Sequence, residues 1–252
     1  MTDRWRIFAN SATLANAVLG VGAVLYVLAG NKLWAMLLIV CAIAFDGMDG
    51  ILSRRSRAPP SRFGRVADSV ADSVSFGVAP AFLIAVHTGD VATWQPWEAA
   101  TLAVAVLYLA AAVARLTYFT TVAHDRPEFL GVPTPQSTLG LVAALLFLDS
   151  PAFAAVLPLG LVLAGVVLSV WMVVPIRYPK IRRGSPLRLP MAVTAVAAAL
   201  ALVPLQFHLA AGSTLYEFAF GASLAFAVGV GSYYLLGPFT VSRIPTEATN
   251  AQ

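Results

Sequence analysis

The chain has 252 residues, of which 59% are hydrophobic and only 11% are charged. Soluble domains carry roughly 25% charged residues, so this composition predicts a bilayer protein and argues against a soluble enzyme. The formal net charge is +4, but the arginines form short loop clusters without a folded module to present them, so we expect no nucleic-acid partner. The single cysteine, Cys41, lies in an apolar run and offers neither a disulfide nor a cysteine-based metal site.

Apolar segments of about 20 residues, long enough to cross ~30 Å of hydrocarbon as helices, follow one another along the chain. They lie at residues 10–29, 33–53, 67–88, 97–122, 136–150, 152–175, 190–210 and 215–236. Backbone groups in lipid must be hydrogen-bonded within the protein. We therefore predict an all-α fold, a polytopic integral membrane bundle of about eight transmembrane helices in a single domain, residues 1–252. The fifth and sixth segments require a very tight turn at Asp149-Ser150-Pro151.

The basic residues predict how the bundle is oriented. With eight spans and both termini in the cytoplasm, nearly all Lys and Arg fall in cytoplasmic loops, and Lys32 alone falls in an outer loop. This bias is typical of the cytoplasmic side. We accordingly expect residues 1–9 to form an interfacial segment and residues 238–252 a cytoplasmic tail. The stretch at residues 46–72 then lies at the cytoplasmic face.

That stretch holds four carboxylates between apolar flanks: Asp46, Asp49, Asp68 and Asp72. Separations of three and four residues place each pair on one face of a helix. Four acids brought together repel one another unless cations neutralise them. Oxygen ligands suit Mg²⁺ or Mn²⁺, and a pair of such ions stabilises charge during phosphoryl displacement. We predict a site for two divalent cations that acts on a phosphate-bearing substrate at the inner leaflet.

The spacing of this stretch resembles the signature of the CDP-alcohol phosphatidyltransferase family. The matching positions are Asp46, Asp49, Gly50, Arg54, Gly64, Asp68 and Asp72, with Ser53 where the family normally has alanine. The resemblance implies a six-helix family core and a CDP-linked lipid substrate such as CDP-diacylglycerol. It also implies an alcohol acceptor whose hydroxyl attacks the β-phosphorus with release of CMP, membrane lipids as surroundings, and a homodimer in the cell membrane of a prokaryote.

The resemblance also assigns roles to residues. All four aspartates are expected to bind the metals, and Asp72 is also expected to be the general base that takes the acceptor's proton. The expected residues around the cytidine diphosphate are Asp49, Gly50, Arg54, Gly64 and Asp68, together with Asn10 and Thr13 of the first span.

Three further runs resemble the phosphatidylserine synthase branch of the family and point to L-serine as the acceptor. They are Ser75-Phe76-Gly77-Val78-Ala79-Pro80, Asn10-x-x-Thr13-x-x-Asn16-x-x-x-Gly20, and Arg115-Leu116 followed by Phe129-Leu130-Gly131-Val132-Pro133-Thr134-Pro135. Serine needs a partner for its carboxylate, and Arg115 is the only cation inside a predicted span. We therefore expect Arg115, and secondarily Arg62, to bind the acceptor.

Several alternatives remain open from the sequence. The acceptor can be glycerol 3-phosphate, an inositol phosphate or choline, or the aspartates can serve a membrane cation transporter instead of an enzyme. Arg115 can snorkel toward the inner face instead of binding substrate. The polar stripe of Asn10, Thr13 and Asn16 can provide ordinary hydrogen bonds between helices instead of binding nucleotide.

Overall fold

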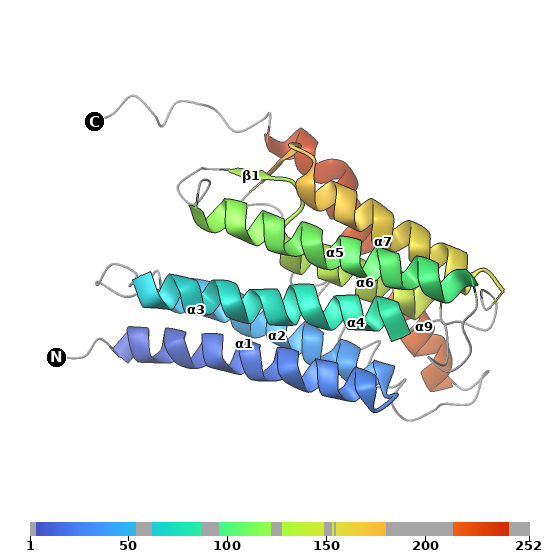
Figure 1. Ribbon diagram of the computed structural model, residues 1–252, viewed down its shortest axis with the longest axis horizontal. Helices are drawn as coiled ribbons and strands as arrows, with labels where there is room; N and C mark the ends of the chain where they lie inside the picture. Colours follow the sequence, from blue (N-terminus) through green and yellow to red (C-terminus); the bar gives the residue numbers. More distant parts are fainter. Residues whose placement is uncertain are drawn as a thin grey trace.

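The computed structural model describes residues 4–53, 62–86, 96–121, 128–148, 153, 155–179 and 214–241. These residues form a bundle of helices that lie side by side (Figure 1). The helices are α1 (Arg4–Leu28), α2 (Lys32–Ser53), α3 (Arg62–Ser73), the π-helix η1 (Val74–Val78), α4 (Ala79–Val86), α5 (Pro96–Thr121), α6 (Thr134–Leu148), α7 (Leu157–Val173) and α9 (Thr214–Val241). Two short strands, β1 (Glu128–Leu130) and β2 (Arg177–Pro179), complete the described chain.

Five helical stretches are long and apolar enough to cross a membrane. They are Arg4–Leu28, Lys32–Ser53, Phe63–Val86, Trp97–Thr121 and Gly221–Phe239, and two shorter apolar helices, Thr134–Leu148 and Leu157–Val173, pack among them. The predicted all-α polytopic membrane fold is thereby confirmed. The seventh expected span, residues 190–210, lies outside the described residues.

Two predicted boundaries differ from those in the structure. Residues 4–9 of the expected interfacial segment form the first turns of α1, because no Gly or Pro interrupts the helix there, and their place at the membrane interface stays a prediction. The sixth helix begins at Leu157 instead of residue 152, with Val156 before it and a proline in its first turn. A proline is favoured there because its missing N–H would have no partner within the helix in any case. The predicted tight turn at 149–151 lies outside the described residues.

The expected tail at residues 238–252 begins inside a helix, because α9 continues through Pro238 to Val241. A proline lacks the N–H that would bond to the carbonyl one turn earlier, here that of Tyr234. The Tyr178 hydroxyl of β2 donates to this carbonyl at 3.2 Å. Burial raises the pKa of Tyr178 above its ordinary value, so the hydroxyl stays protonated and donates. β2 thereby supplies the hydrogen bond that the proline removes.

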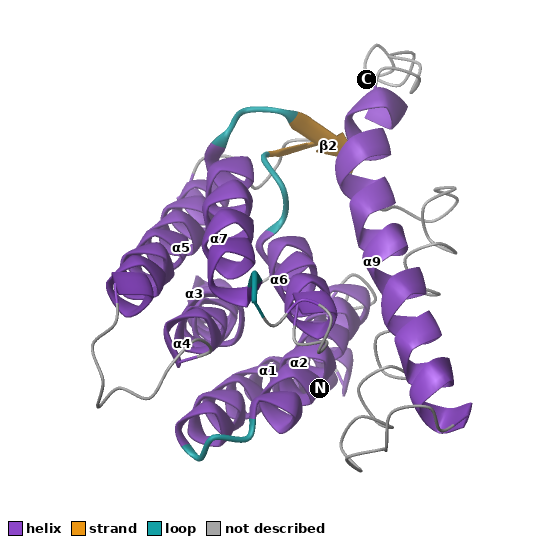
Figure 2. Ribbon diagram, turned by 90° about the vertical axis from the view of Figure 1, so that its right-hand side faces the viewer, coloured by secondary structure: helices purple, strands orange, loops and turns teal. Residues whose placement is uncertain are grey.

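The strand pair is a feature that the all-α prediction lacked. β1 and β2 are antiparallel, with Phe129 opposite Tyr178, and β2 lies beside α9 (Figure 2). Gly131 follows β1 with φ of 73°, a conformation that glycine adopts without steric cost. Its N–H donates to Ile176 O at 2.8 Å. The pair therefore links the segment before α6 to the segment after α7.

The π-helix η1 joins α3 to α4 and is held from two sides. A π-helix shifts the backbone hydrogen-bond pattern, and the Thr138 hydroxyl of α6 lies 3.3 Å from the carbonyl oxygen of Phe76 in η1. On the other side, Gly20 of α1 allows close approach, because a Cβ there would lie 2.8 Å from the Cα of Ser75. α1 and α6 thereby fix the position of the helix that carries Asp68 and Asp72.

Candidate active site

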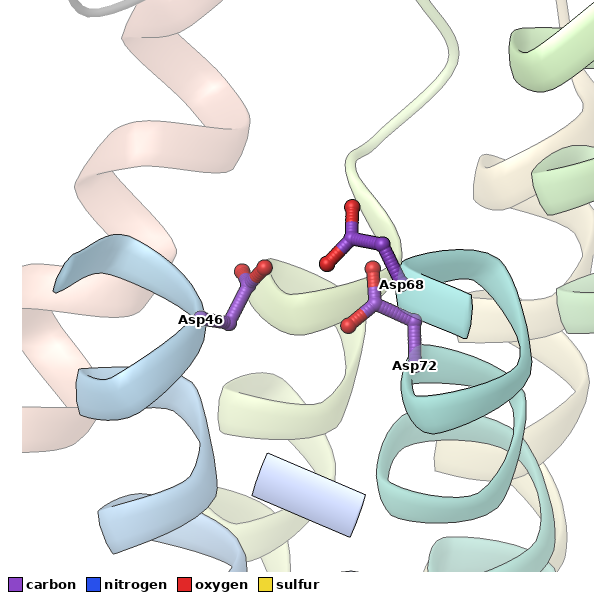
Figure 3. A group of neighbouring side chains, drawn as sticks. All are labelled: Asp46, Asp68 and Asp72. Carbon is purple, nitrogen blue, oxygen red and sulfur yellow. The ribbon is translucent and has the colours of Figure 1, made fainter. Parts of the chain in front are cut away.

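Three of the four predicted aspartates converge between α2 and α3. Asp46 projects from α2 toward Asp68 and Asp72 on α3 (Figure 3). Each offers a carboxylate oxygen, and these three oxygens lie within 4.8 Å of one another. Asp68 and Asp72 share one face of α3 because four residues make about one helical turn. All three residues are half-buried.

Asp49, the fourth aspartate, lies beside this group. Its Oδ2 accepts a hydrogen bond from the Thr13 hydroxyl of α1, and its carboxylate interacts with that of Asp68. Thr13, expected around the nucleotide, thus holds a carboxylate on the neighbouring helix. The four acids form a core of three with Asp49 adjacent to it.

Asn16 provides the second link from α1 to the carboxylates. Its side chain is fully buried, and its Nδ2 donates to Asp72 Oδ1 at 2.9 Å. Its backbone carbonyl accepts from the Ser75 hydroxyl at 2.9 Å, whereas its Oδ1 has no hydrogen-bond partner. The polar stripe was recognisable in the sequence, but nothing in the spacing indicated that Asn16 bonds the predicted base.

Arg115 lies inside the bundle on α5. It is only 8% exposed, so it does not snorkel to the surface. One terminal nitrogen donates to Thr134 Oγ1 at 2.9 Å, and its Cζ lies 5.6 Å from the centre of the Phe129 ring. The guanidinium also interacts electrostatically with Asp72 and Tyr233, while its Nε has no partner. A buried cation with a spare donor therefore lies on the Asp72 side of the site.

The surroundings of Arg115 were missed by sequence reasoning. Thr134 is fully buried at the start of α6, and the polar run from Thr134 to Thr138 at the start of an apolar helix was the available signal. Phe129 belongs to the unexpected strand β1. Tyr233 stacks on Tyr178 with ring centroids 5.6 Å apart, and no sequence spacing links these residues to α5.

For the other predicted site residues, the structure gives a position on a helix or does not describe them. Gly50 lies near the end of α2, Gly64 in the first turn of α3, and Asn10 on an exposed position of α1. Arg54 lies outside the described residues. Arg62 begins α3, and its side chain is outside the described part.

The three convergent carboxylates fit a divalent cation. They offer only oxygen, which suits Mg²⁺ or Mn²⁺, and their mutual repulsion falls when a cation binds among them. Asp46, Asp68 and Asp72 would hold such an ion, and Asp49 is close enough to Asp68 to contribute to a second one.

The comparisons with known proteins agree with this geometry. The sequence profile of the CDP-alcohol phosphatidyltransferase family matches residues 6–174. The chain belongs to this family. It is therefore a transferase of phospholipid biosynthesis and not a membrane cation transporter. Members of the family generally depend on divalent cations. No solved structure gave a significant match.

Individual relatives are similar over much of their length. A CDP-diacylglycerol–serine O-phosphatidyltransferase of Helicobacter pylori (strain J99) is 30% identical over 183 residues, 70% of this chain and 73% of the relative. An archaetidylserine synthase of Methanothermobacter thermautotrophicus is 28% identical over 170 residues, 67% of this chain and 68% of the relative. β2 and α9 lie beyond the family match, so the stacked pair of Tyr178 and Tyr233 comes from outside the matched region.

Proposed function

We propose that this transferase moves the phosphatidyl group of CDP-diacylglycerol to the hydroxyl of L-serine, forming phosphatidylserine and CMP. The observation that carries the choice of serine is Arg115. Burying a cation is costly unless its donors are satisfied, and Arg115 keeps an Nε without a hydrogen-bond partner among the described residues. A carboxylate on the acceptor satisfies that donor, and serine has one whereas choline does not.

The names of the relatives support the same acceptor. The Helicobacter protein is named for serine and CDP-diacylglycerol, and the Methanothermobacter protein is named for archaetidylserine. The two names share serine and differ in the lipid. Serine is therefore the acceptor that the names of both relatives support.

The chemistry assigned to the chain is a single displacement. The serine hydroxyl oxygen attacks the β-phosphorus of the CDP-lipid, the new O–P bond forms, and the P–O bond to CMP breaks. The hydroxyl proton passes to the Asp72 carboxylate, which the hydrogen bond from Asn16 orients. Two Mg²⁺ or Mn²⁺ ions held by Asp46, Asp49, Asp68 and Asp72 would neutralise the diphosphate and the developing charge.

The remaining expectations complete the proposal. Gly50, Arg54, Gly64, Asn10 and Thr13 surround the cytidine diphosphate. This end of the bundle faces the cytoplasm of a prokaryotic cell, with both termini on that side, and the arginine-rich sequence between α2 and α3 supports this orientation. The protein acts as a homodimer.

The experiment is CMP release by purified protein in detergent, with CDP-diacylglycerol and Mg²⁺ or Mn²⁺. L-serine, glycerol 3-phosphate, an inositol phosphate and choline are each added alone. Serine-dependent release is expected, and Arg115→Leu should reduce kcat/KM for serine by roughly 10- to 100-fold, because charge-assisted hydrogen bonds are worth about 1.5–3 kcal/mol. Release with another acceptor and none with serine would contradict the proposal.

A further inference from the structure

Among the residues that the structure describes, two buried side-chain polar atoms lack a hydrogen-bond partner: Asn16 Oδ1 and Arg115 Nε. Unpaired buried polar atoms are rare in native proteins and call for a physical explanation. One of these atoms is an acceptor and the other is a donor. They therefore offer opposite hydrogen-bonding capacities.

Asn16 bonds Asp72 from α1, and Arg115 lies on α5, which also packs against α3. Asn16 donates to Asp72 Oδ1 at 2.9 Å, and this bond fixes which end of the amide carries the unpaired oxygen. Arg115 interacts electrostatically with the same carboxylate. α3, which carries Asp72, lies between α1 and α5 (Figure 2). The helix of the predicted base therefore lies between the helix that carries the unpaired acceptor and the helix that carries the unpaired donor.

The depth of Arg115 in the bundle supports this arrangement. Thr138 of α6 meets the Phe76 carbonyl of η1, and α3–η1 and α6 run in the same direction (Figure 1). One turn earlier on α6 is Thr134, which bonds Arg115 at 2.9 Å. Four residues before Phe76 is Asp72, at the end of α3 that precedes η1. Similar steps along two helices that run in the same direction put Arg115 near the level of Asp72.

We infer that Asn16 Oδ1 and Arg115 Nε form the two ends of a pocket for a zwitterionic amino-acid acceptor, which makes Asn16 a specificity-determining residue. This inference rests on the proposed function. The α-ammonium donates to Asn16 Oδ1, the α-carboxylate accepts from Arg115 Nε, and the side-chain hydroxyl faces Asp72. Both atoms are covered in this structure, so the covering side chains part when the acceptor enters.

If Asn16 only orients Asp72 and does not bind the ammonium group, its substitution should affect the acceptors differently. Loss of orientation slows the reaction of every acceptor, whereas loss of Oδ1 affects only acceptors that carry an ammonium group. L-serine and 3-hydroxypropionate differ in that group and share the carboxylate and the primary hydroxyl. The ratio of their kcat/KM values isolates the ammonium, and the fraction of folded enzyme cancels in it.

The test measures this ratio by CMP release for the unsubstituted protein, Asn16→Ala and the milder Asn16→Ser. The unsubstituted protein should favour serine by about 10- to 100-fold, the value of a charge-assisted hydrogen bond, and both variants should bring the ratio close to one. Asn31→Ala is the matched control, because it makes the same change in the turn between α1 and α2, where Asn31 Oδ1 accepts from Trp34 N. It should leave the ratio unchanged.

The complementary substrate is ethanolamine, which keeps the ammonium and lacks the carboxylate. The ratio of serine to ethanolamine should collapse in Arg115→Leu and stay unchanged in Asn16→Ala. An unsubstituted ratio of serine to 3-hydroxypropionate near one would overturn the pocket, as would equal losses for both acceptors in the Asn16 variants. Absence of serine-dependent release from the unsubstituted protein would instead refute the proposed function itself, before any variant is compared.

Discussion

The hydrogen bond between Arg115 and Thr134 gives a quantitative test of the buried cation. The change is Thr134→Val, which keeps the β-branched shape and removes the hydroxyl. The bond is 2.9 Å long and both partners are buried, with Arg115 8% and Thr134 0% exposed. Water therefore cannot replace the lost acceptor, and the full cost of a charged hydrogen bond, about 1.5–3 kcal/mol, should appear in the stability.

For a chain of this size, each kcal/mol shifts the melting temperature by roughly 2–4 °C, so Thr134→Val should melt about 3–12 °C lower. Thermal unfolding in detergent measures this shift. The control is Thr121→Val on α5, where the exposed hydroxyl bonds only the Thr117 carbonyl of its own helix. Thr121→Val should melt close to the unsubstituted protein.

The melting temperature of Thr134→Val in the presence of L-serine provides a second measurement on the same variant. Removing Thr134 Oγ1 frees a second guanidinium donor for the acceptor's carboxylate, so saturating serine should raise the melting temperature of Thr134→Val more than that of the unsubstituted protein. A Thr134→Val protein that melts with the control would refute the role of this bond. A variant that melts lower but gains no more from serine would refute the carboxylate assignment.

Two further predictions concern the helix contact and the metals. Gly20→Ala should lower the free energy of unfolding by about 1–3 kcal/mol and reduce serine-dependent CMP release, because the added Cβ would lie 2.8 Å from Ser75 Cα and push α1 away from η1. The control is Gly221→Ala, whose added Cβ would have nothing within 4 Å. Equal stability and equal CMP release of the two variants would contradict this packing. Chelation of divalent cations should abolish CMP release, and added Mg²⁺ or Mn²⁺ should restore it. Asp46→Asn should require a higher metal concentration for half-maximal release. Full activity after verified metal removal would contradict the metal site.

The local geometry of the carboxylates could be predicted from the sequence. Asp68 and Asp72 share a face because their separation is close to one helical turn, and the structure places them on α3 as that spacing requires. Asp46 and Asp49 share a helix in the same way. That Asp46 converges with the α3 pair while Asp49 pairs with Thr13 depends on how α1, α2 and α3 pack together, which spacing along one helix does not encode.

The long-range parts of the site could not be predicted. η1 changes the helical pattern after Ser73, and its carbonyl partner, Thr138, comes from α6. The partner of the Tyr234 carbonyl is Tyr178, 56 residues away. Such contacts arise from tertiary packing and carry no periodic signal. Arg115 was recognisable as an unusual charge in a span, but its burial against Thr134 and Phe129 required the folded bundle.

The most direct test of the central claim is the reaction of Asp72→Asn beside the unsubstituted protein, with CDP-diacylglycerol, L-serine and Mg²⁺ or Mn²⁺. The unsubstituted protein should release one CMP for each phosphatidylserine formed. Asp72→Asn, which keeps a hydrogen-bonding side chain beside Asn16 but cannot take the proton, should lose the reaction by at least about 100-fold. Undiminished phosphatidylserine synthesis by folded Asp72→Asn, or release of CMP that does not depend on serine, would contradict the account.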